Sequence, residues 1–200
     1  PIVGNSNGMP VSGNGTYILA GGSDSALYVS TNGSSLVQHS QNPIAAYNDN
    51  KDTWKCLALN GTGKYGMAIS SNKVYVYASS SNSYDNNSSW TDITGATGVP
   101  SASTVNTCMI SNNGLVFAIG TSSGIYISSN YGTSWSQLLS TKNVLSIDMT
   151  IASGIDGRYI YASVNGSDTI YVSSDSGSNF SANSASSTLA YNSVFVSGNG

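Results

Sequence analysis

A repeat of about 45 residues constrains the fold of this 200-residue chain more than any other feature. Segment 125–135 reads Ile-Tyr-Ile-Ser-Ser-Asn-Tyr-Gly-Thr-Ser-Trp, and segment 170–180 repeats that pattern at a constant offset of 45 positions. A further 45 positions back lies 83–90, and the earliest copy, 28–36, is one residue shorter in its turn. A fixed period of this length is typical of units that stack on one another and bury a shared core.

Each unit reads as four short strands. A glycine opens an apolar run in every unit, at Gly15, Gly63, Gly114 and Gly157, and each glycine is typical of a hairpin turn. The strands have four to six residues rich in Val, Ile and Tyr, and no segment sustains a 3.6-residue period. The sequence therefore predicts an all-β chain with units at approximately 9–53, 54–104, 105–143 and 144–192, and 193–200 starting or closing a further unit.

The turn that ends the third strand of each unit resembles the Asp box, S-x-D-x-G-x-x-W. The matching residues are Ser83, Asp85 and Trp90; Ser128, Asn130, Gly132 and Trp135; and Ser173, Asp175, Gly177 and Phe180; the first unit keeps Ser30 and Asn32. The chain thus resembles the BNR-repeat propellers, a group that includes sialidases, sortilin-type receptor domains, xyloglucanases and a photosystem assembly factor. The resemblance implies a β-propeller of four-stranded antiparallel blades.

The residues of these turns have a local structural logic. An Asx side chain bonds turn amides, a glycine or asparagine takes the positive-φ position, and the aromatic residue packs between sheets. The resemblance places Asp boxes away from the usual active face. We therefore interpret Asp85, Asn130 and Asp175 as folding residues rather than catalytic ones.

The two ends of the chain fall in the same strand of the repeat. Val11-Ser12-Gly13-Asn14-Gly15 recurs as Val196-Ser197-Gly198-Asn199-Gly200. Either the last strand completes the first blade of a closed four-bladed ring, or the chain is part of a larger ring. Closure with four blades is the rarer geometry, so the second hypothesis is favoured, and a first residue other than Met fits a processed product or a fragment.

Few residues offer catalytic chemistry. Arg158 is the only arginine, whereas a sialidase needs three, and the absence of glutamate leaves only aspartates for glycoside hydrolysis. Asp148 is the one candidate, because it lies between Ile147 and Met149, where burial would raise its pKa. The alternative, which we favour, is an aspartate on the polar side of a strand. His39 is the only histidine and has no cysteine or acidic cluster nearby, so neither a metal site nor another cofactor is expected.

The two cysteines lie in corresponding strands of adjacent units. Cys56 precedes its unit's glycine by seven positions and Cys108 precedes its own by six. An offset of one residue turns side chains to opposite faces of a strand, so buried free thiols are the favoured interpretation and a disulfide is the alternative.

The composition limits which binding partners and which cellular location are expected. Charged residues are only 8%, the net charge is −3, and the basic residues are scattered singly, so nucleic acid is not an expected partner. No apolar run approaches the length of roughly 18 residues that a membrane helix needs. The hydroxyl-rich composition suits an extracellular, cell-surface or virion-surface setting, in which N-glycosylation would be possible. The N-x-S/T sequons are Asn14, Asn32, Asn60, Asn86, Asn87, Asn165 and Asn179.

The sequence as a whole favours a noncatalytic module that serves as a scaffold for adhesion, carbohydrate contact or self-assembly, with carbohydrate or other copies of itself as partners. Two alternatives remain. One is an Asp-box glycoside hydrolase of the xyloglucanase kind or a remnant of one. The other is a sortilin-like receptor domain that binds a peptide in its channel.

Overall fold

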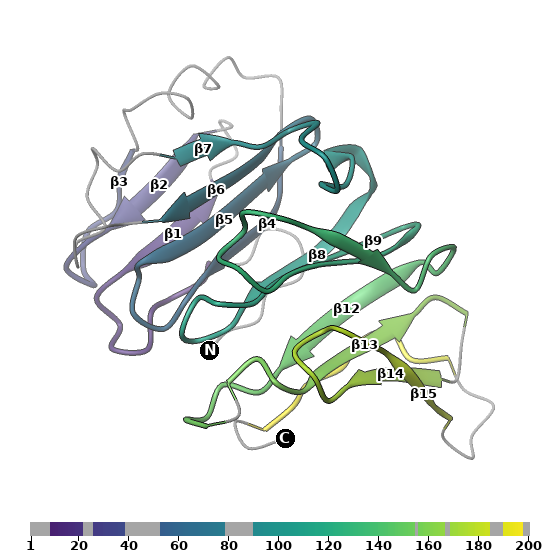
Figure 1. Ribbon diagram of the computed structural model, residues 1–200. Coiled ribbons are helices and arrows are strands. Elements are labelled where there is room, and N and C mark those ends of the chain that lie inside the picture. Colours follow the sequence, from purple (N-terminus) through teal and green to yellow (C-terminus); the bar gives the residue numbers. More distant parts are fainter. Residues whose placement is uncertain are drawn as a thin grey trace.

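The chain folds into four antiparallel β-sheets arranged as a fan (Figure 1). The computed structural model describes residues 9–21, 26–38, 53–78, 90–154, 156–166, 169–184 and 190–197. Blade 1 contains β1 (Ile18–Gly21), β2 (Leu27–Ser30) and β3 (Val37–Gln38); blade 2 contains β4 (Trp54–Leu59), β5 (Tyr65–Ser70), β6 (Val74–Ala78) and β7 (Trp90–Asp92). Blade 3 contains β8 (Val105–Ile110), β9 (Phe117–Thr121), β10 (Gly124–Ser128) and β11 (Ser136–Leu138); blade 4 contains β12 (Val144–Met149), β13 (Ile160–Val164), β14 (Thr169–Ser173) and β15 (Ser181–Ser184).

Each blade is an up-and-down sheet in chain order. In blade 1 the innermost position is taken by the segment around Val11, which forms an antiparallel bridge with Ile18. The one helical segment among the described residues is a 3-10 turn at Ala102–Thr104, named η2. The predicted all-β fold with four-stranded antiparallel units is therefore confirmed.

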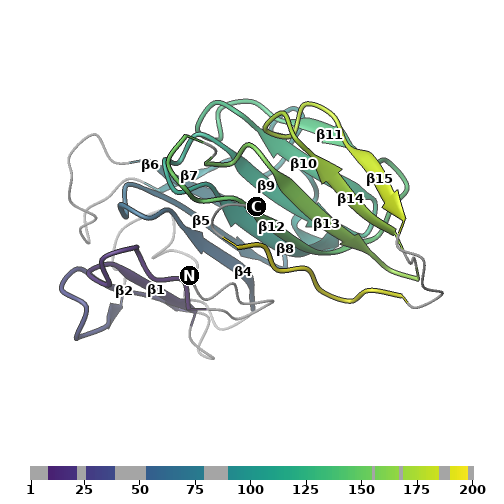
Figure 2. The ribbon, with the colours of Figure 1, turned by 90° about the horizontal axis from the view of Figure 1, so that it is seen from below.

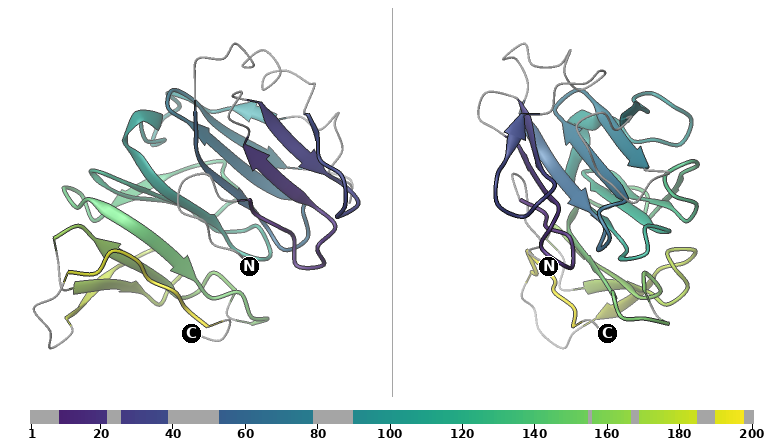
Figure 3. Two further views of the ribbon diagram at one scale, coloured as in Figure 1. Left: turned by 180° about the vertical axis from the view of Figure 1, so that it is seen from behind. Right: turned by 90° about the vertical axis from the view of Figure 1, so that its left-hand side faces the viewer.

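The inner strands hold neighbouring blades together. β1 packs on β4, β4 on β8, and β8 on β12, so the blades follow one another in chain order around a common axis. Within the described ranges, no comparable contact joins β12 to β1, and the fan stays open between its two ends (Figures 1 and 3). This arrangement is a β-propeller architecture that does not close within the described part of the chain. No helix among the described residues is long and apolar enough to cross a membrane.

Strands in the middle of the fan are buried on both faces, which explains their uninterrupted apolar runs. All five residues of β9 are buried. The buried side chains form three clusters, each between two consecutive blades. Residues that alternate along an inner strand therefore belong to different clusters.

We call the side of a blade that faces the next blade in the chain its forward face, and the opposite side its back face. Leu57 packs back against blade 1, while its neighbour Ala58 packs forward against blade 3. Likewise Cys108 packs back against blade 2 and Met109 packs forward against blade 4. The corresponding forward position of β12 is Asp148, so blade 4 presents a carboxylate where blades 2 and 3 present apolar side chains.

The glycine turns also connect adjacent blades. Gly63 and Gly114 adopt φ angles of 74° and 80°, as the predicted hairpin turns require. A side chain at Gly63 would collide with the ring of Tyr17, and one at Gly114 would collide with the ring of Tyr65. The tyrosine that follows the glycine of one blade therefore packs over the glycine of the next blade, which accounts for the recurring Gly-x-Tyr pattern.

The favoured interpretation of the cysteines was wrong, because Cys56 and Cys108 form a disulfide with their Cα atoms 5.9 Å apart. The two residues lie on the inner strands of consecutive blades, which run in the same direction. Equivalent positions then face the same way, so an offset of one residue turns one side chain forward and the other back, toward each other. The offset favours a bond between blades, whereas it would oppose a bond within a single sheet.

Candidate functional site

Asp148 is a buried carboxylate that accepts two backbone hydrogen bonds. Its side chain is on β12 and the residue is 4% exposed. The amide of Met149 donates to Oδ1 at 2.9 Å, and the amide of Val196 donates to Oδ2 at 2.6 Å. Ser146, two positions earlier on the same face, accepts a hydrogen bond of 3.4 Å from the amide of Val194. Residues 190–197 thus lie against the forward face of blade 4 (Figure 2).

Burial raises the pKa of Asp148 above its ordinary value of 3.8, and the hydrogen bonds from Val196 and Met149 act in the opposite direction. The direction agrees with the expectation from its apolar neighbours in sequence. The contacts, however, are those of a structural residue, because each carboxylate oxygen is already bound to a backbone amide. A general acid or base needs at least one oxygen facing its substrate.

A second carboxylate, that of the half-buried Asp156, joins blade 4 to blade 3. It lies in the loop between β12 and β13, and it accepts hydrogen bonds from the amides of Asn112 at 2.7 Å and Asn113 at 2.5 Å. Burial raises the pKa of Asp156, and these two amides partly offset that effect. Sequence reasoning missed this residue. The signal was the longer connection before Gly157, since the turns of the other blades are tighter.

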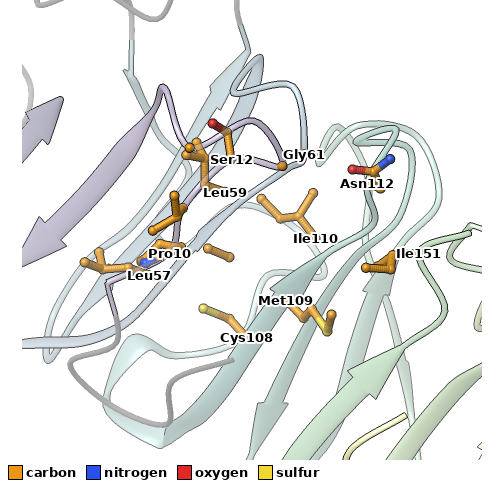
Figure 4. A pocket seen from close by; sticks show the side chains of 14 residues that line it. Pro10, Ser12, Leu57, Leu59, Gly61, Cys108, Met109, Ile110, Asn112 and Ile151 are labelled. Carbon is orange, nitrogen blue, oxygen red and sulfur yellow. The ribbon is translucent and has the colours of Figure 1, made fainter. Parts of the chain in front are cut away.

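An apolar cavity of about 560 Å³ lies along the inner strands, which we call the axial cavity (Figure 4). Leu57, Leu59, Met109 and Ile110 line it, and Ser12, Gly61 and Asn112 lie at one end. Among the described residues around it there is no aspartate, histidine, lysine or arginine. The axial cavity therefore offers shape and apolar surface, with hydrogen-bonding groups only at its polar end.

The turns that precede the outermost strands share one geometry, and we call them the Ser-x-Asx turns. In blade 3, Ser128 Oγ donates to Asn130 Oδ1 at 2.9 Å and accepts the amide of Gly132 at 2.9 Å. Asn130 Oδ1 also accepts the amide of Ser134, and the indole of Trp135 donates to the carbonyl of Gly132 at 3.1 Å. These side chains therefore satisfy the backbone groups of the turn.

The same pattern recurs in blades 4 and 1. Ser173 Oγ donates to Asp175 Oδ1 at 2.8 Å, and Gly177 donates its amide to Ser173 at 2.9 Å. Hydrogen bonds from Asn179 and from Ser173 lower the pKa of Asp175 to about 2. In blade 1, Ser30 donates to Asn32 at 3.1 Å in the shorter turn.

The aromatic residues near these turns pack between blades as predicted. Trp135 lies edge-on to Phe117, with ring centroids 6.2 Å apart. Phe180 packs against the cluster between blades 3 and 4. In blade 2, Trp90 is 3% exposed and belongs to the cluster between blades 1 and 2. The centroid of its ring lies 5.5 Å from that of Tyr77. The candidate positions Ser83, Asp85, Asn86 and Asn87, together with His39, lie outside the described residues.

The sequons differ in their surroundings. Asn60 is 1% exposed, and its side-chain amide donates to the carbonyl of Asn112 at 2.9 Å, so the folded chain has no room for a glycan there. Asn179 donates its side-chain amide to Asp175 within the turn. Asn14, Asn32 and Asn165 are exposed. No group of three or more metal-binding side chains occurs among the residues that the structure describes.

Solved structures with similar folds include a YCF48 propeller, GH74 enzymes and WD40-repeat proteins. YCF48 bound to the D1 peptide superposes with a TM-score of 0.58 at 12% identity, covering 95% of this chain and 56% of the other. The GH74 xyloglucanase from Xanthomonas campestris gives a TM-score of 0.60 at 12% identity, covering 90% of this chain and 30% of the other. The RRP9 WD40 repeats give 0.58 at 10% identity, covering 92% and 52%.

These likenesses establish the β-propeller fold and nothing finer, because the identities are very low. This chain spans about half or less of the length of the structures it resembles. No protein-family model matches the sequence, and no curated protein matches it.

Proposed function

We propose that this chain is a noncatalytic propeller scaffold that holds an apolar group of a partner in its axial cavity. The observation that carries the proposal is the chemistry of that cavity: its described lining is apolar with a few uncharged polar groups and contains no acidic or basic side chain. Cavities of this kind bind through shape and burial of apolar surface.

The best hydrolase candidate is engaged elsewhere. Asp148 does not line the axial cavity, and both of its oxygens accept backbone amides. Glycoside hydrolysis needs two carboxyl groups that flank the scissile bond. We therefore prefer binding to hydrolysis, although xyloglucanases are among the proteins with a similar fold.

An extended peptide with apolar side chains is the occupant that best fits the axial cavity. One propeller of similar fold, YCF48, has been solved with a bound peptide. The polar end at Ser12 and Asn112 offers hydrogen-bonding groups to a peptide backbone, while Leu59 and Met109 offer contacts for side chains. This proposal retains the peptide-receptor alternative in a form that the cavity supports.

We further propose that the chain belongs to the BNR-repeat group of propellers and that it works outside the cell or on a surface. The Ser-x-Asx turns, with Trp135 and Phe180 packed behind them, support degenerate Asp boxes of the BNR-repeat kind. A hydroxyl-rich chain with exposed sequons at Asn14 and Asn165 suits an extracellular, cell-surface or virion-surface scaffold for adhesion or carbohydrate contact.

Binding of the apolar dye ANS, compared between variants, tests the role of the cavity. We expect Leu59→Asp to lose most of the dye fluorescence, because a charge would enter the cavity wall, while Leu36→Asp retains it, since Leu36 is 45% exposed and lies outside the cavity. Equal fluorescence from both variants would contradict the proposal. Cleavage of xyloglucan or β-glucan by the unmutated chain, lost in Asp148→Asn, would contradict its noncatalytic character.

A further inference from the structure

Asparagine followed by glycine recurs at the turns of this chain. The pairs within the described residues are Asn14-Gly15, Asn32-Gly33, Asn60-Gly61, Asn113-Gly114 and Asn165-Gly166. The two residues of such a pair can react with each other, because glycine has no Cβ to keep its backbone nitrogen away from the asparagine side chain. The reaction needs a glycine amide and an asparagine carboxamide that are both free to meet. The surroundings of each pair therefore decide where it occurs.

In three of the pairs the glycine amide is already a hydrogen-bond donor. Gly15 and Gly114 each donate to the carbonyl of the residue three positions earlier, at 2.9 Å. Gly33 donates to the hydroxyl of Ser30 at 3.1 Å. The nitrogens that would react are therefore held by their own turns.

The asparagine side chains of these turns are held as well. The Oδ1 atom accepts the amide two positions later at 3.1 Å in Asn14, 3.0 Å in Asn32 and 2.8 Å in Asn113. Asn60 is 1% exposed, and its Oδ1 accepts the amide of Tyr65 at 2.9 Å. A carboxamide held in this way turns its carbon toward the next backbone nitrogen only after the turn opens locally.

The turn between β13 and β14 differs from the others. Asn165 and Gly166 are both exposed, and no hydrogen bond from another described residue reaches the Asn165 carboxamide or the Gly166 amide. A Cβ at Gly166 would meet no atom within 4 Å. The main-chain amide of Asn165 donates to the carbonyl of Asn143 at 2.8 Å. The backbone is thus anchored at the start of the pair, while both reacting groups are free.

We propose that Asn165 is a self-modifying site, at which the carboxamide is converted to a carboxylate by the neighbouring backbone. The Gly166 nitrogen gives its proton to water and forms a bond to Cγ of Asn165 with its electron pair. The bond between Cγ and the side-chain nitrogen breaks, and that nitrogen takes up a proton and leaves as ammonia.

Water then opens the cyclic imide at either of its carbonyls, which gives aspartate or isoaspartate. The whole reaction consumes water, releases ammonia and places a negative charge on the turn between β13 and β14. This inference goes beyond the scaffold function, and it does not depend on what the axial cavity holds, because Asn165 and Gly166 do not line that cavity.

Peptide mapping by mass spectrometry measures the conversion at each of these pairs in one sample. The folded chain, shown by intact mass to carry no glycan, is incubated in mildly alkaline buffer. We expect Asn165 to convert at least about tenfold faster than Asn32 and Asn113, because those pairs react only after their turns open. Conversion at Asn165 no faster than at Asn113 would overturn the proposal.

Two variants show that the signal comes from this turn. Asn165→Gln should abolish the conversion there, because the longer side chain would have to close a larger ring. Asn32→Gln is the matched control, since it removes another exposed Asn-Gly pair and should leave the conversion at Asn165 unchanged. Loss of the signal in both variants would contradict the assignment to Asn165.

The unfolded chain supplies the reference rates. In guanidinium chloride with a thiol reductant the turns are absent, so the described pairs should convert at similar rates. If Asn165 exceeds the other pairs by the same ratio in the unfolded chain, the local sequence and not the folded turn sets its reactivity, and the proposal is overturned. The dye-binding test of the axial cavity is unaffected by either result.

Discussion

The forward faces of blade 2 and blade 4 are built on equivalent strand positions but have opposite chemistry. Blade 2 presents Cys56 and Ala58, and it is fixed to blade 3 by a disulfide and an apolar cluster. Blade 4 presents Ser146 and Asp148, and both accept amides from residues 190–197. The comparison teaches that the same backbone supports a covalent, apolar joint in the middle of the fan and a hydrogen-bonded, polar joint at its end.

The largest expected effect concerns the covalent joint. Removing the disulfide by Cys56→Ser with Cys108→Ser should lower the free energy of unfolding by about 4 kcal/mol, because the bond closes a loop of 52 residues in the unfolded chain. Urea unfolding measures the difference. The unmodified chain under strong reductant is the control and should approach the stability of the double variant. Equal stability of the oxidised chain and the double variant would show that this joint does not depend on the bond.

A smaller effect is expected at the polar joint. Asp148→Ala should cost about 2 kcal/mol, because the amides of Met149 and Val196 lose their acceptor in a buried place. Asp148→Asn keeps one acceptor oxygen and should cost less. The same urea experiment distinguishes the two variants. If alanine and asparagine are equally tolerated, the carboxylate does not hold residues 190–197.

The smallest effect is a pH dependence of the same joint. Burial raises the pKa of Asp148 above 3.8, so the folded chain binds the proton of this carboxyl group more tightly than the unfolded chain does. The stability of the unmodified chain relative to Asp148→Asn should therefore be greatest below pH 3.8 and fall as the pH rises through the raised value. The slope cannot exceed about 1.4 kcal/mol per pH unit for one proton.

Unfolding curves of both chains between about pH 3 and pH 7 measure this difference. Asp175, with its pKa lowered to about 2, has the opposite dependence and cancels in the comparison, because both chains contain it. A relative stability that rises with pH would contradict the assigned direction.

Sequence alone predicted the parts of this fold that are local. The repeat, the glycine turns and the aromatic residues behind the Ser-x-Asx turns of blades 3 and 4 all follow from short segments, and the described blades contain them. Strand alternation predicted on which side of β12 Asp148 lies, because residues two positions apart share a side and Ser146 is on the same one. Its pKa direction followed from its apolar neighbours in the strand.

Contacts between blades were harder to predict, because they depend on how one sheet is oriented relative to the next. Cys56 and Cys108 were misjudged for this reason, and Asp156 was missed although it binds two amides of blade 3. Asp148 also accepts a hydrogen bond from the amide of Val196, which lies 48 positions away in sequence, and no local pattern indicates that contact. The axial cavity arises only when three inner strands are placed side by side.

Hydrogen exchange at the amides of Val194 and Val196, followed residue by residue by NMR, tests the central claim most directly. If residues 190–197 lie against the forward face of blade 4, both amides should be protected, because Ser146 and Asp148 accept them. Exchange of Val194 and Val196 at the rates of an unstructured peptide would contradict the account.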